Sequence, residues 1–401
     1  MAGESEHQVR GRIREVFWAF LRLGLTSFGG PSAHIGYFHD EFVKRRHWLD
    51  EAAYADLVAL CQFLPGPASS QLGFAMGKAR AGWGGAIAAW AGFTLPSAAI
   101  MICLAMGLAR VQPTALAPWL HGLKLAAVAV VAQAVGTMAG KLSRGKTRLP
   151  ITLAAGALVL MWDSAAAQLV ALVLAAAIAS RWNDDSTSTL SIPGSHPKPG
   201  PLPGLTLLAL FGALLVGLPF LAFITGSRDL QLLDRFYRAG ALVFGGGHVV
   251  LPFLQSAVVT PGWVSPDEFL AGYGFAQALP GPLFTFAAYL GVASHPGPGS
   301  VFAGLAALSA VFLPGLLLVA GVLPSWDRWR GDRRLRAALD GANAAVVGVL
   351  FATLVTPLAT TTLRRPADWL VALGGTALLG LKLPSWAVVP LCATASWLVG
   401  R

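Results

Sequence analysis

The sequence predicts an all-α integral membrane protein whose two halves are copies of one another. Of its 401 residues, 55% are hydrophobic and only 12% are charged, and the mean hydropathy is +0.63. A soluble domain carries about 25% charged residues and less apolar side chain. Five segments stay apolar over the roughly 20 residues that a helix needs to cross a membrane, namely 83–110, 116–140, 205–225, 299–323 and 337–360. No alternating strand pattern competes with these predicted helices.

Two further apolar regions, 149–181 and 366–399, are each interrupted near the middle. Asp163 interrupts the first region and Pro384 the second. A charge is costly in the bilayer and a proline removes a helical donor, so each region is expected to form a pair of shorter or tilted helices.

A short motif breaks the helical pattern once in each half. Gln-Phe-Leu-Pro-Gly-Pro at 62–67 returns as Gln-Ala-Leu-Pro-Gly-Pro at 277–282. Pro-Gly-Pro cannot continue a helix, because proline lacks an amide donor and disfavours helical backbone before it. In the first half we therefore expect a helix over 50–64 and a returning helix over 67–80. Together they would form a re-entrant hairpin whose tip lies near the middle of the membrane.

Other motifs repeat at nearly the same offset, which indicates a tandem duplication. Phe28-Gly29-Gly30 recurs 216 positions later as Phe244-Gly245-Gly246, and the Pro-Gly-Pro motif recurs 215 positions later. Basic residues exchange loops between the copies: 44–47 is basic and 260–262 neutral, whereas 328–336 is far more basic than 110–118. By the positive-inside rule, the halves are expected to form an inverted-topology repeat with about five crossings each.

Four regions are expected along the chain: a cytoplasmic leader at 1–14, a first transmembrane repeat at 15–182, a polar Pro-rich linker at 183–204 and a second transmembrane repeat at 205–401. The leader mixes acids with bases before an apolar run that contains Arg22, which argues against a cleaved secretory signal. The linker composition is typical of a connection without a packed core.

Charge and cysteine content exclude several function classes. The formal net charge of +10 lies largely in short loops between apolar segments. This is the positive-inside distribution, so the lipid bilayer is the expected partner and nucleic acid is not. The cysteines Cys61, Cys103 and Cys392 are far apart, with no CxxC or HxxxH spacing. They are interpreted as packing residues, and neither a metal nor another cofactor is expected.

The helix breaks form a candidate anion site. Each break leaves backbone N–H groups at the start of the next helix, where the helix dipole is positive. Matched breaks in two halves point to a transporter site near the midplane, although Pro-Gly kinks that only shape packing are the alternative. The candidate substrate-binding residues at the breaks are Phe28, Gly29, Gly30, Gln62, Pro65, Gly66, Pro67, Ser69, Ser70, Gln71, Gly245, Gly246, Gly247, Gln277, Pro280, Gly281, Pro282 and Thr285.

Charges within the apolar segments are further candidates, because burying a charge in a membrane is costly. Arg22 and Arg238 are equivalent, each six residues before a Phe-Gly-Gly, and Lys124 is equivalent to Asp340. Two arginines and a lysine would suit a doubly charged tetrahedral oxyanion. Alternatively, the arginines snorkel to the interface, and Lys124 and Asp340 pair structurally.

Two histidines and an acid complete the candidate set. His34 and His248 follow the Gly-Gly breaks, where they would donate to the anion, carry a coupling proton or serve only as satisfied structural residues. Glu51 lies at a predicted helix start, where helix capping is the expected role and proton relay the alternative. Glu51 and Asp340 are the candidates for ion coupling.

The sequence resembles the chromate ion transporter family over nearly its whole length. The resemblance rests on the motifs at 26–38, 60–67, 93–97 and around Lys124, and in the second half on 244–248, 277–282 and 343–347. It adds Asn343 to the candidate substrate-binding residues. It implies a two-domain, long-chain, multi-pass protein of the bacterial inner membrane that exports chromate and confers resistance to it. The second half has Gly247 in place of Pro31 and Asp340 in place of Lys124, so an asymmetric site is expected.

The resulting prediction is a secondary active transporter that works by alternating access of two inverted halves around an oxyanion site. An enzyme is disfavoured, because no nucleophile, metal set or cofactor fingerprint accompanies the histidines. Sulfate remains open as the substrate, because it is near-isosteric with chromate and small shape differences are worth only about 1–3 kcal/mol. An anion channel and a homodimer also remain open.

Overall fold

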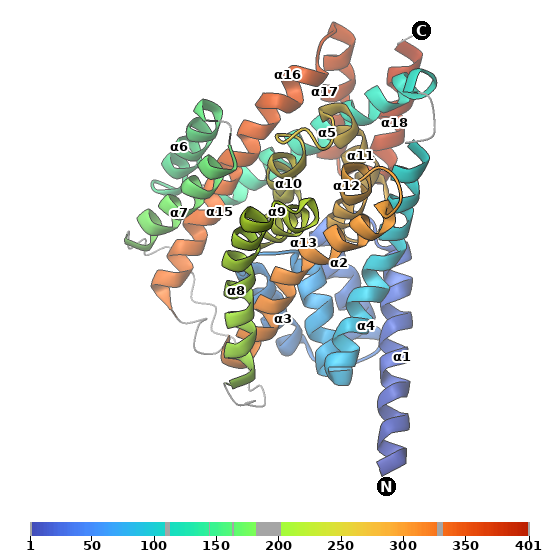
Figure 1. The fold of residues 1–401 in the computed structure, drawn as a ribbon, viewed down its shortest axis with the longest axis vertical. Coiled ribbons are helices and arrows are strands. Elements are labelled where there is room, and N and C mark those ends of the chain that lie inside the picture. Colours follow the sequence, from blue (N-terminus) through green and yellow to red (C-terminus); the bar gives the residue numbers. More distant parts are fainter. Residues whose placement is uncertain are drawn as a thin grey trace.

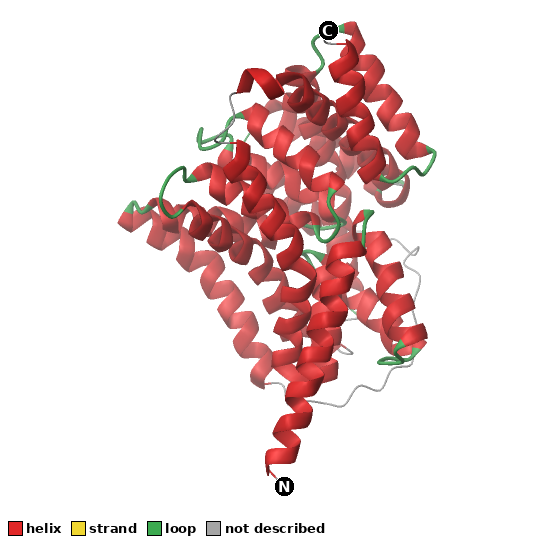
Figure 2. Ribbon diagram, turned by 90° about the vertical axis from the view of Figure 1, so that its right-hand side faces the viewer, coloured by secondary structure: helices red, strands yellow, loops and turns green. Residues whose placement is uncertain are grey.

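The computed structural model describes residues 2–108, 113–143, 145–162, 164–181, 202–326 and 332–399. All regular secondary structure in these ranges is helical (Figure 2), which confirms the predicted all-α class for this part of the chain. The predicted linker lies outside the described residues except for 202–204, as do Asp163 and part of the loops used in the charge comparison. The molecule is elongated, and the N- and C-terminal ends lie at opposite ends of its long axis (Figure 1).

The first half folds into seven α-helices and a π-helical segment within the described ranges. In chain order they are α1 (Ala2–Thr26), α2 (Gly30–Phe38), η1 (His39–Arg45), α3 (Glu51–Phe63), α4 (Ala68–Leu108), α5 (Pro113–Leu142), α6 (Arg148–Met161) and α7 (Ala165–Arg181).

The second half follows the same order after one additional helix, α8. Its described elements are α8 (Leu202–Thr225), α9 (Arg228–Ala241), η2 (Gly247–Val249), α10 (Val250–Val258), α11 (Pro266–Ala278), η3 (Leu283–Thr285), α12 (Phe286–Ser294), α13 (Ser300–Val322), η4 (Leu323–Ser325), α15 (Arg333–Thr353), η5 (Leu354–Ala359), α16 (Thr360–Thr362), α17 (Pro366–Gly380) and α18 (Ser385–Val399).

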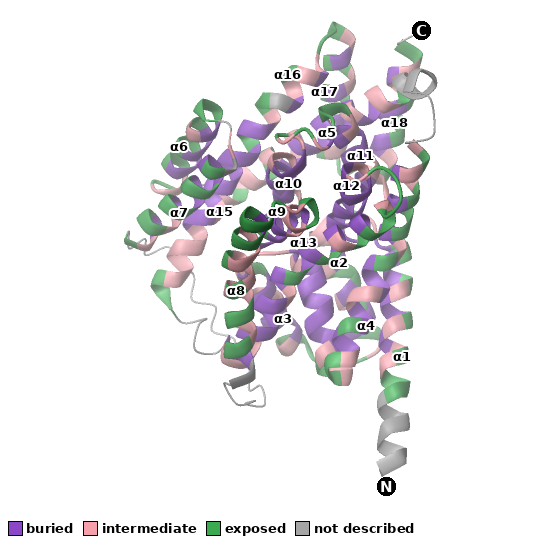
Figure 3. Ribbon diagram, in the orientation of Figure 1, coloured by how far each residue is buried: buried purple, intermediate pink, exposed green. Residues whose placement is uncertain are grey.

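The five long apolar segments are confirmed as helices long and apolar enough to cross a membrane. They lie at 68–108, 118–142, 204–225, 300–325 and 333–362. The two interrupted regions are confirmed as helix pairs, α6 with α7 and α17 with α18. Helix α8 is the least enclosed of the long helices, with only 6% of its most apolar stretch buried, and lies at the edge of the bundle (Figure 3). Its apolar surface is available to lipid.

The N-terminal residues do not form a segment separate from the first helix. Helix α1 runs without interruption from Ala2 to Thr26, so the predicted leader and the short helix expected after it are one 25-residue helix. The stretch contains no proline, and nothing in it forces the backbone to leave the helix. The helix ends where Gly29 and Gly30 adopt φ values of 102° and 77°, which residues with a side chain rarely reach.

Each Pro-Gly-Pro motif forms a turn that joins two helices in a hairpin. Helix α3 leads to a turn at Gly66 (φ 122°), and helix α11 leads to a turn at Gly281 (φ 89°). The returning helix of the first hairpin ends at Arg80, because Ala81 and Gly82 leave helical geometry and divide α4 into two helices. The second of these rises along the long axis of the molecule in Figure 1, whereas its repeat counterpart α13 descends.

The two halves exchange their last helix pairs. Helix α5 of the first half packs against α17 and α18 of the second, and α15 of the second half packs against α6 and α7 of the first. Small residues permit the close approach: a Cβ atom on Gly348 of α15 would overlap the Thr152 carbonyl of α6, and one on Gly122 of α5 would overlap α18 at Ala393. The packed units therefore differ from the two halves of the sequence.

Candidate functional site

The Pro-Gly-Pro turn of each half is hydrogen-bonded to the first helix break of the other half. The Gly66 amide donates to the Val243 carbonyl at 2.7 Å, and the Gly281 amide donates to the Ser27 carbonyl at 2.9 Å. Ser27 and Val243 are equivalent residues of the repeat, and so are Gly66 and Gly281. The contact is therefore reciprocal, and it uses the two glycine amides that the sequence had offered as anion donors.

Contacts between residues next to the breaks show that all four breaks lie close to one another. A Cβ atom on Gly247 would lie 3.2 Å from Cγ of Pro31, its equivalent in the first half. The side-chain amide nitrogen of Gln71 donates to the Pro65 carbonyl at 2.9 Å and to the Gly315 carbonyl on α13 at 3.0 Å. The structure thus brings the four predicted breaks to one region between the halves.

Polar side chains without a partner gather at the first-half breaks. His34 is 1% exposed, and its Nδ1 lies 3.3 Å from the Ser69 hydroxyl, while its ring packs edge-on against Phe93. Buried polar groups are rarely left unsatisfied. Within the described part of the chain, however, several buried atoms here lack a hydrogen-bond partner: His34 Nε2, Ser27 Oγ, Ser70 Oγ, Gln71 Oε1 and Thr94 Oγ1.

The start of α4 adds backbone donors to this polar region. The Gln71 amide is bonded to the Pro67 carbonyl, whereas the amides of Ala68, Ser69 and Ser70 precede the first full helical turn and have no backbone acceptor among the described residues. Such amides carry the partial positive charge of a helix N-terminus. Hydroxyl, imidazole and amide donors therefore adjoin one helix start.

The corresponding groups of the second half are mostly engaged. His248 Nδ1 lies 2.9 Å from the Tyr273 hydroxyl and 3.4 Å from the Gln277 amide nitrogen. The Thr285 hydroxyl donates to the Pro282 carbonyl at 2.9 Å. Asn343 Oδ1 is the exception: it is buried without a partner among the described residues, and a Cβ atom on Gly245 would lie 3.2 Å from it. The two halves of the site therefore differ in the polar atoms that they leave without a partner among the described residues.

The remaining aromatic and polar candidates, Phe28, Gln62 and Gln277, differ in burial and in their contacts. Phe28 contacts Trp386 of α18, with ring centroids 5.8 Å apart. The side chain of Gln62 is exposed, whereas that of Gln277 is buried. The backbone carbonyl of Gln277 accepts from the Ser385 hydroxyl at 2.9 Å. Gln277 thus anchors α18 to the second hairpin.

The predicted cations have different surroundings. Arg238 pairs with the buried Asp234 one turn earlier on α9. Arg22 is exposed and has no acidic partner among the described residues, since Trp18 occupies the position equivalent to Asp234. Of the two equivalent arginines, Arg22 is the one whose charge is not balanced locally.

Lys124, Asp340 and Glu51 form ion pairs with residues that the sequence had not singled out as their partners. Lys124 pairs with Asp267 of α11 at 2.8 Å, and Asp340 pairs with Arg148 of α6 at 2.7 Å. Both pairs join the two halves, and Lys124 and Asp340 do not pair with each other. Glu51 is the first residue of α3, and its Oε2 lies 2.8 Å from Nε2 of His39. No cluster of three His, Cys, Asp or Glu side chains suited to a metal occurs in the described ranges.

Sequence reasoning missed Ser27, Thr94, Val243 and Gly315 as parts of this region. Ser27 and Thr94 stand inside motifs that the sequence displays, next to Phe28 and before Pro96, but a hydroxyl in an apolar helix is also compatible with bonding to its own helix. Val243 and Gly315 contribute only carbonyl groups. Because every residue has a backbone carbonyl, the side-chain type does not reveal which carbonyls take part in the site.

Comparison with known proteins gives a family for this architecture. The chain is 29% identical over 397 residues to the probable chromate transport protein of Synechococcus elongatus, covering 96% of this chain and 94% of the relative. It is 29% identical over 417 residues to the chromate transport protein of Pseudomonas aeruginosa, covering 96% and 92%. It is 28% identical over 353 residues to that of Cupriavidus metallidurans, covering 86% and 82%. No solved structure matches the chain.

The family model described as "Chromate transporter" matches the chain twice, at residues 14–181 and 230–397. The two matches begin 216 positions apart, the offset at which the Phe-Gly-Gly motif repeats. They cover most of the chain and confirm the duplication, and they agree with the multi-pass helical architecture described above. The chain belongs to the chromate transporter family, as a two-domain member.

Proposed function

We propose that this protein is a secondary active transporter that moves chromate out of the cell across the bacterial inner membrane. Membership of the family supports the substrate, as do relatives named as chromate transport proteins. The observation that carries the site is the set of buried groups on Ser27, His34 and Ser70 that can donate and have no partner among the described residues. A tetrahedral dianion would supply acceptors for several donors at once, and a helix N-terminus favours its charge.

The proposed site is asymmetric. The first half supplies His34, Ser69, Ser70 and the amides that begin α4, and the second half supplies the turn at Gly245 beside Asn343. Arg22 supplies a positive charge that no neighbouring acid offsets among the described residues. Arginine suits an oxyanion because its planar group presents several donors in a fixed arrangement.

Alternating access of two inverted halves is the proposed mechanism. Its support is the reciprocal bonding of Gly66 to Val243 and of Gly281 to Ser27, together with the opposite directions of α13 and the second part of α4 (Figure 1). Transporters of this kind bind substrate at broken helices between inverted repeats. Rocking would break one of the two reciprocal bonds at a time and release a glycine amide to the anion.

The exchanged helix pairs limit how the two halves can move in this proposal. Helix α5 with α17 and α18 forms one unit, and α15 with α6 and α7 forms the other. Each unit contains helices from both halves, so a motion that separated the sequence halves would have to open the glycine contacts at Gly122 and Gly348. A rocking motion that keeps each exchanged helix pair on its partner helix leaves those contacts intact.

Flux of radiolabelled chromate into everted membrane vesicles tests the proposal. Uptake should be saturable and should depend on an ion gradient, identified by collapsing the pH gradient and the voltage separately. Flux that does not saturate would indicate a channel. Sulfate is the matched competitor: transport of sulfate in preference to chromate would overturn the substrate, and absence of any oxyanion flux would overturn the transport proposal.

A further inference from the structure

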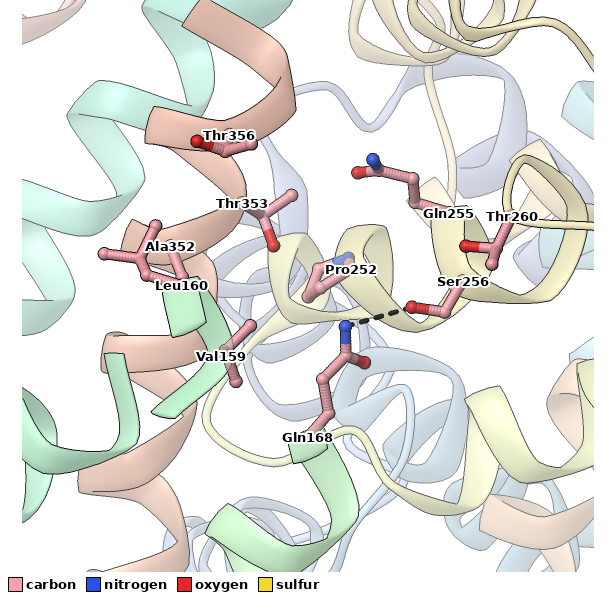
Figure 4. Close-up of a pocket in the computed structure, with 10 residues that line it drawn as sticks. All are labelled: Val159, Leu160, Gln168, Pro252, Gln255, Ser256, Thr260, Ala352, Thr353 and Thr356. Atoms are coloured by element: carbon pink, nitrogen blue, oxygen red, sulfur yellow. Dashed lines mark hydrogen bonds between the residues drawn. The ribbon is translucent and has the colours of Figure 1, made fainter. Parts of the chain in front are cut away.

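A small polar cavity lies away from the helix breaks, between α6 and α7 of the first half and α10 and α15 of the second (Figure 4). It has room of about 30 Å³, enough for one water molecule or one small ion. In Figure 4, Gln168 points into the cavity from α7, opposite Thr353 and Thr356, while Gln255, Ser256 and Thr260 line the side formed by α10 and the turn after it.

Two glutamine side chains leave amide oxygens unused at this cavity. The Gln168 amide nitrogen donates to the Ser256 hydroxyl at 3.0 Å, but its Oε1 is buried without a partner in the described part of the chain. Gln168 is only 3% exposed. Gln255 Oε1 is also buried and has no partner among the described residues. Leaving a buried acceptor unsatisfied costs about 1–3 kcal/mol, so a ligand that such oxygens can coordinate would relieve this cost.

Helix ends determine the sign of the charge that the cavity favours. Val159 and Leu160 lie in the last turn of α6, Gln255 and Ser256 lie in the last turn of α10, and Thr353 is the last residue of α15. Thr356 then leaves helical geometry, with φ −134° and ψ 120°. The C-terminal ends of three helices carry partial negative charge. Two described helical stretches start here. The Ser164 hydroxyl caps α7 by accepting from the Ala167 amide at 3.1 Å, and a short stretch that leads into α16 begins after the kink at Thr356.

We infer that this cavity is a binding site for a monovalent alkali cation of about the size of Na⁺. None of the ten lining residues titrates, so the cavity has no group of its own to carry a proton. None carries a carboxylate, which Ca²⁺ and Mg²⁺ sites normally use. An anion would meet three negative helix ends. Transporters coordinate coupling Na⁺ with unwound backbone carbonyls and helix C-terminal ends, and in this cavity amide and hydroxyl oxygens lie beside such ends.

The cavity is connected to the proposed oxyanion site through two helices. Helix α10 continues from η2, directly after the break at Gly245 and Gly246, and its last turn lines the cavity. Helix α15 carries Asn343 beside Gly245 and ends at Thr353 in the cavity, ten residues or roughly 15 Å further along the helix. A cation bound here would hold both helices relative to α6 and α7. The role in coupling rests on the proposed transport function, whereas the cation site itself does not.

Cation binding to the purified full chain, with no oxyanion present, tests the site. The unfolding temperature should rise with NaCl relative to the same concentration of choline chloride, because a ligand that binds only the folded state stabilises it. Direct binding of radioactive Na⁺ gives a second readout. Gln255→Leu and Gln168→Leu should each require at least about tenfold more Na⁺ for the same effect, as expected for the loss of a group that supports an ion.

Gln133→Leu is the matched control, because Gln133 lies on α5 and its amide donates to the Thr137 hydroxyl outside the cavity. It should keep the Na⁺ response of the parent protein. If the leucine variants fail to fold, Ser256→Ala removes a single hydroxyl and should weaken the response in the same direction. Equal stabilisation by NaCl and choline chloride, or an unchanged Na⁺ response in the cavity variants, would overturn the site. Failure of chromate flux would leave this binding result unaffected.

Discussion

The amide of Gly281 donates a hydrogen bond to the carbonyl of Ser27 at 2.9 Å, and thereby ties the second hairpin to the first helix break. The equivalent bond, from Gly66 to Val243, ties the first hairpin to the second helix break. A pair of reciprocal bonds between equivalent residues is what a two-fold relation between repeats produces. Because each hairpin tip depends on a backbone carbonyl of the other half, neither half completes its own turn.

Gly281→Ala should therefore damage both stability and transport. Gly281 has φ 89°, and a Cβ atom would lie 2.8 Å from the Ser97 hydroxyl oxygen. Strained backbone of this kind costs about 1–3 kcal/mol. Thermal unfolding should show the loss of stability, and chromate flux should fall. Gly107→Ala is the control, because Gly107 lies within α4 and a Cβ atom there meets nothing within 4 Å. Equal behaviour of the two variants would contradict the role of the turn.

Ser70→Ala separates a binding role from a structural one. The Ser70 hydroxyl is buried without a partner among the described residues, so its removal should leave the unfolding temperature unchanged or slightly higher. If it donates to the bound oxyanion, the KM for chromate should rise by about tenfold or more, because hydrogen bonds to charged groups contribute about 1.5–3 kcal/mol. Ser180→Ala is the control, since that hydroxyl donates to the Ala177 carbonyl on α7. An unchanged KM would remove Ser70 from the site.

Arg22→Ala should affect mainly transport, whereas Arg238→Ala should affect mainly stability. Arg22 has no acidic partner among the described residues, so its loss should abolish transport while leaving membrane insertion and the unfolding temperature close to those of the parent. Loss of Arg238 leaves the buried Asp234 without its partner and should cost about 1–3 kcal/mol of stability. Normal flux in Arg22→Ala vesicles, with the protein present at the parental level, would exclude Arg22 from the site.

The helices and turns of this fold could be predicted from the sequence, whereas the contacts between distant residues could not. Hydropathy located the long helices, and Pro-Gly-Pro located the turns at Gly66 and Gly281, because apolar runs and helix-breaking residues act locally. The partners of Lys124 and Asp340 could not be predicted, since Asp267 and Arg148 are distant in the chain and come close only when the halves interlock.

The exchange of helix pairs between the halves also could not be predicted from the sequence. Glycines such as Gly348 indicate that another helix approaches closely, but they do not say which one. The cation-site residues escaped notice for a related reason: Gln168 and Gln255 are isolated polar residues until α7 and α10 are placed on either side of one cavity. Hydroxyls such as Thr94 carry no more information, because they bond equally well to their own helix.

Gly348→Ala tests the exchange of helix pairs itself. A Cβ atom on Gly348 would overlap the Thr152 carbonyl, so α15 could no longer lie against α6 at its present distance. The Thr152 hydroxyl, which donates to the Ala344 carbonyl of α15 at 2.9 Å, would lose that bond as the helices separate. Overpacking of this kind costs about 1–3 kcal/mol, which thermal unfolding should detect as a lower unfolding temperature. Gly374→Ala is the matched control, since a Cβ atom on that residue of α17 meets nothing within 4 Å. Because α6 and α15 belong to different halves, an unchanged unfolding temperature in Gly348→Ala would mean that each half keeps its own last helix pair.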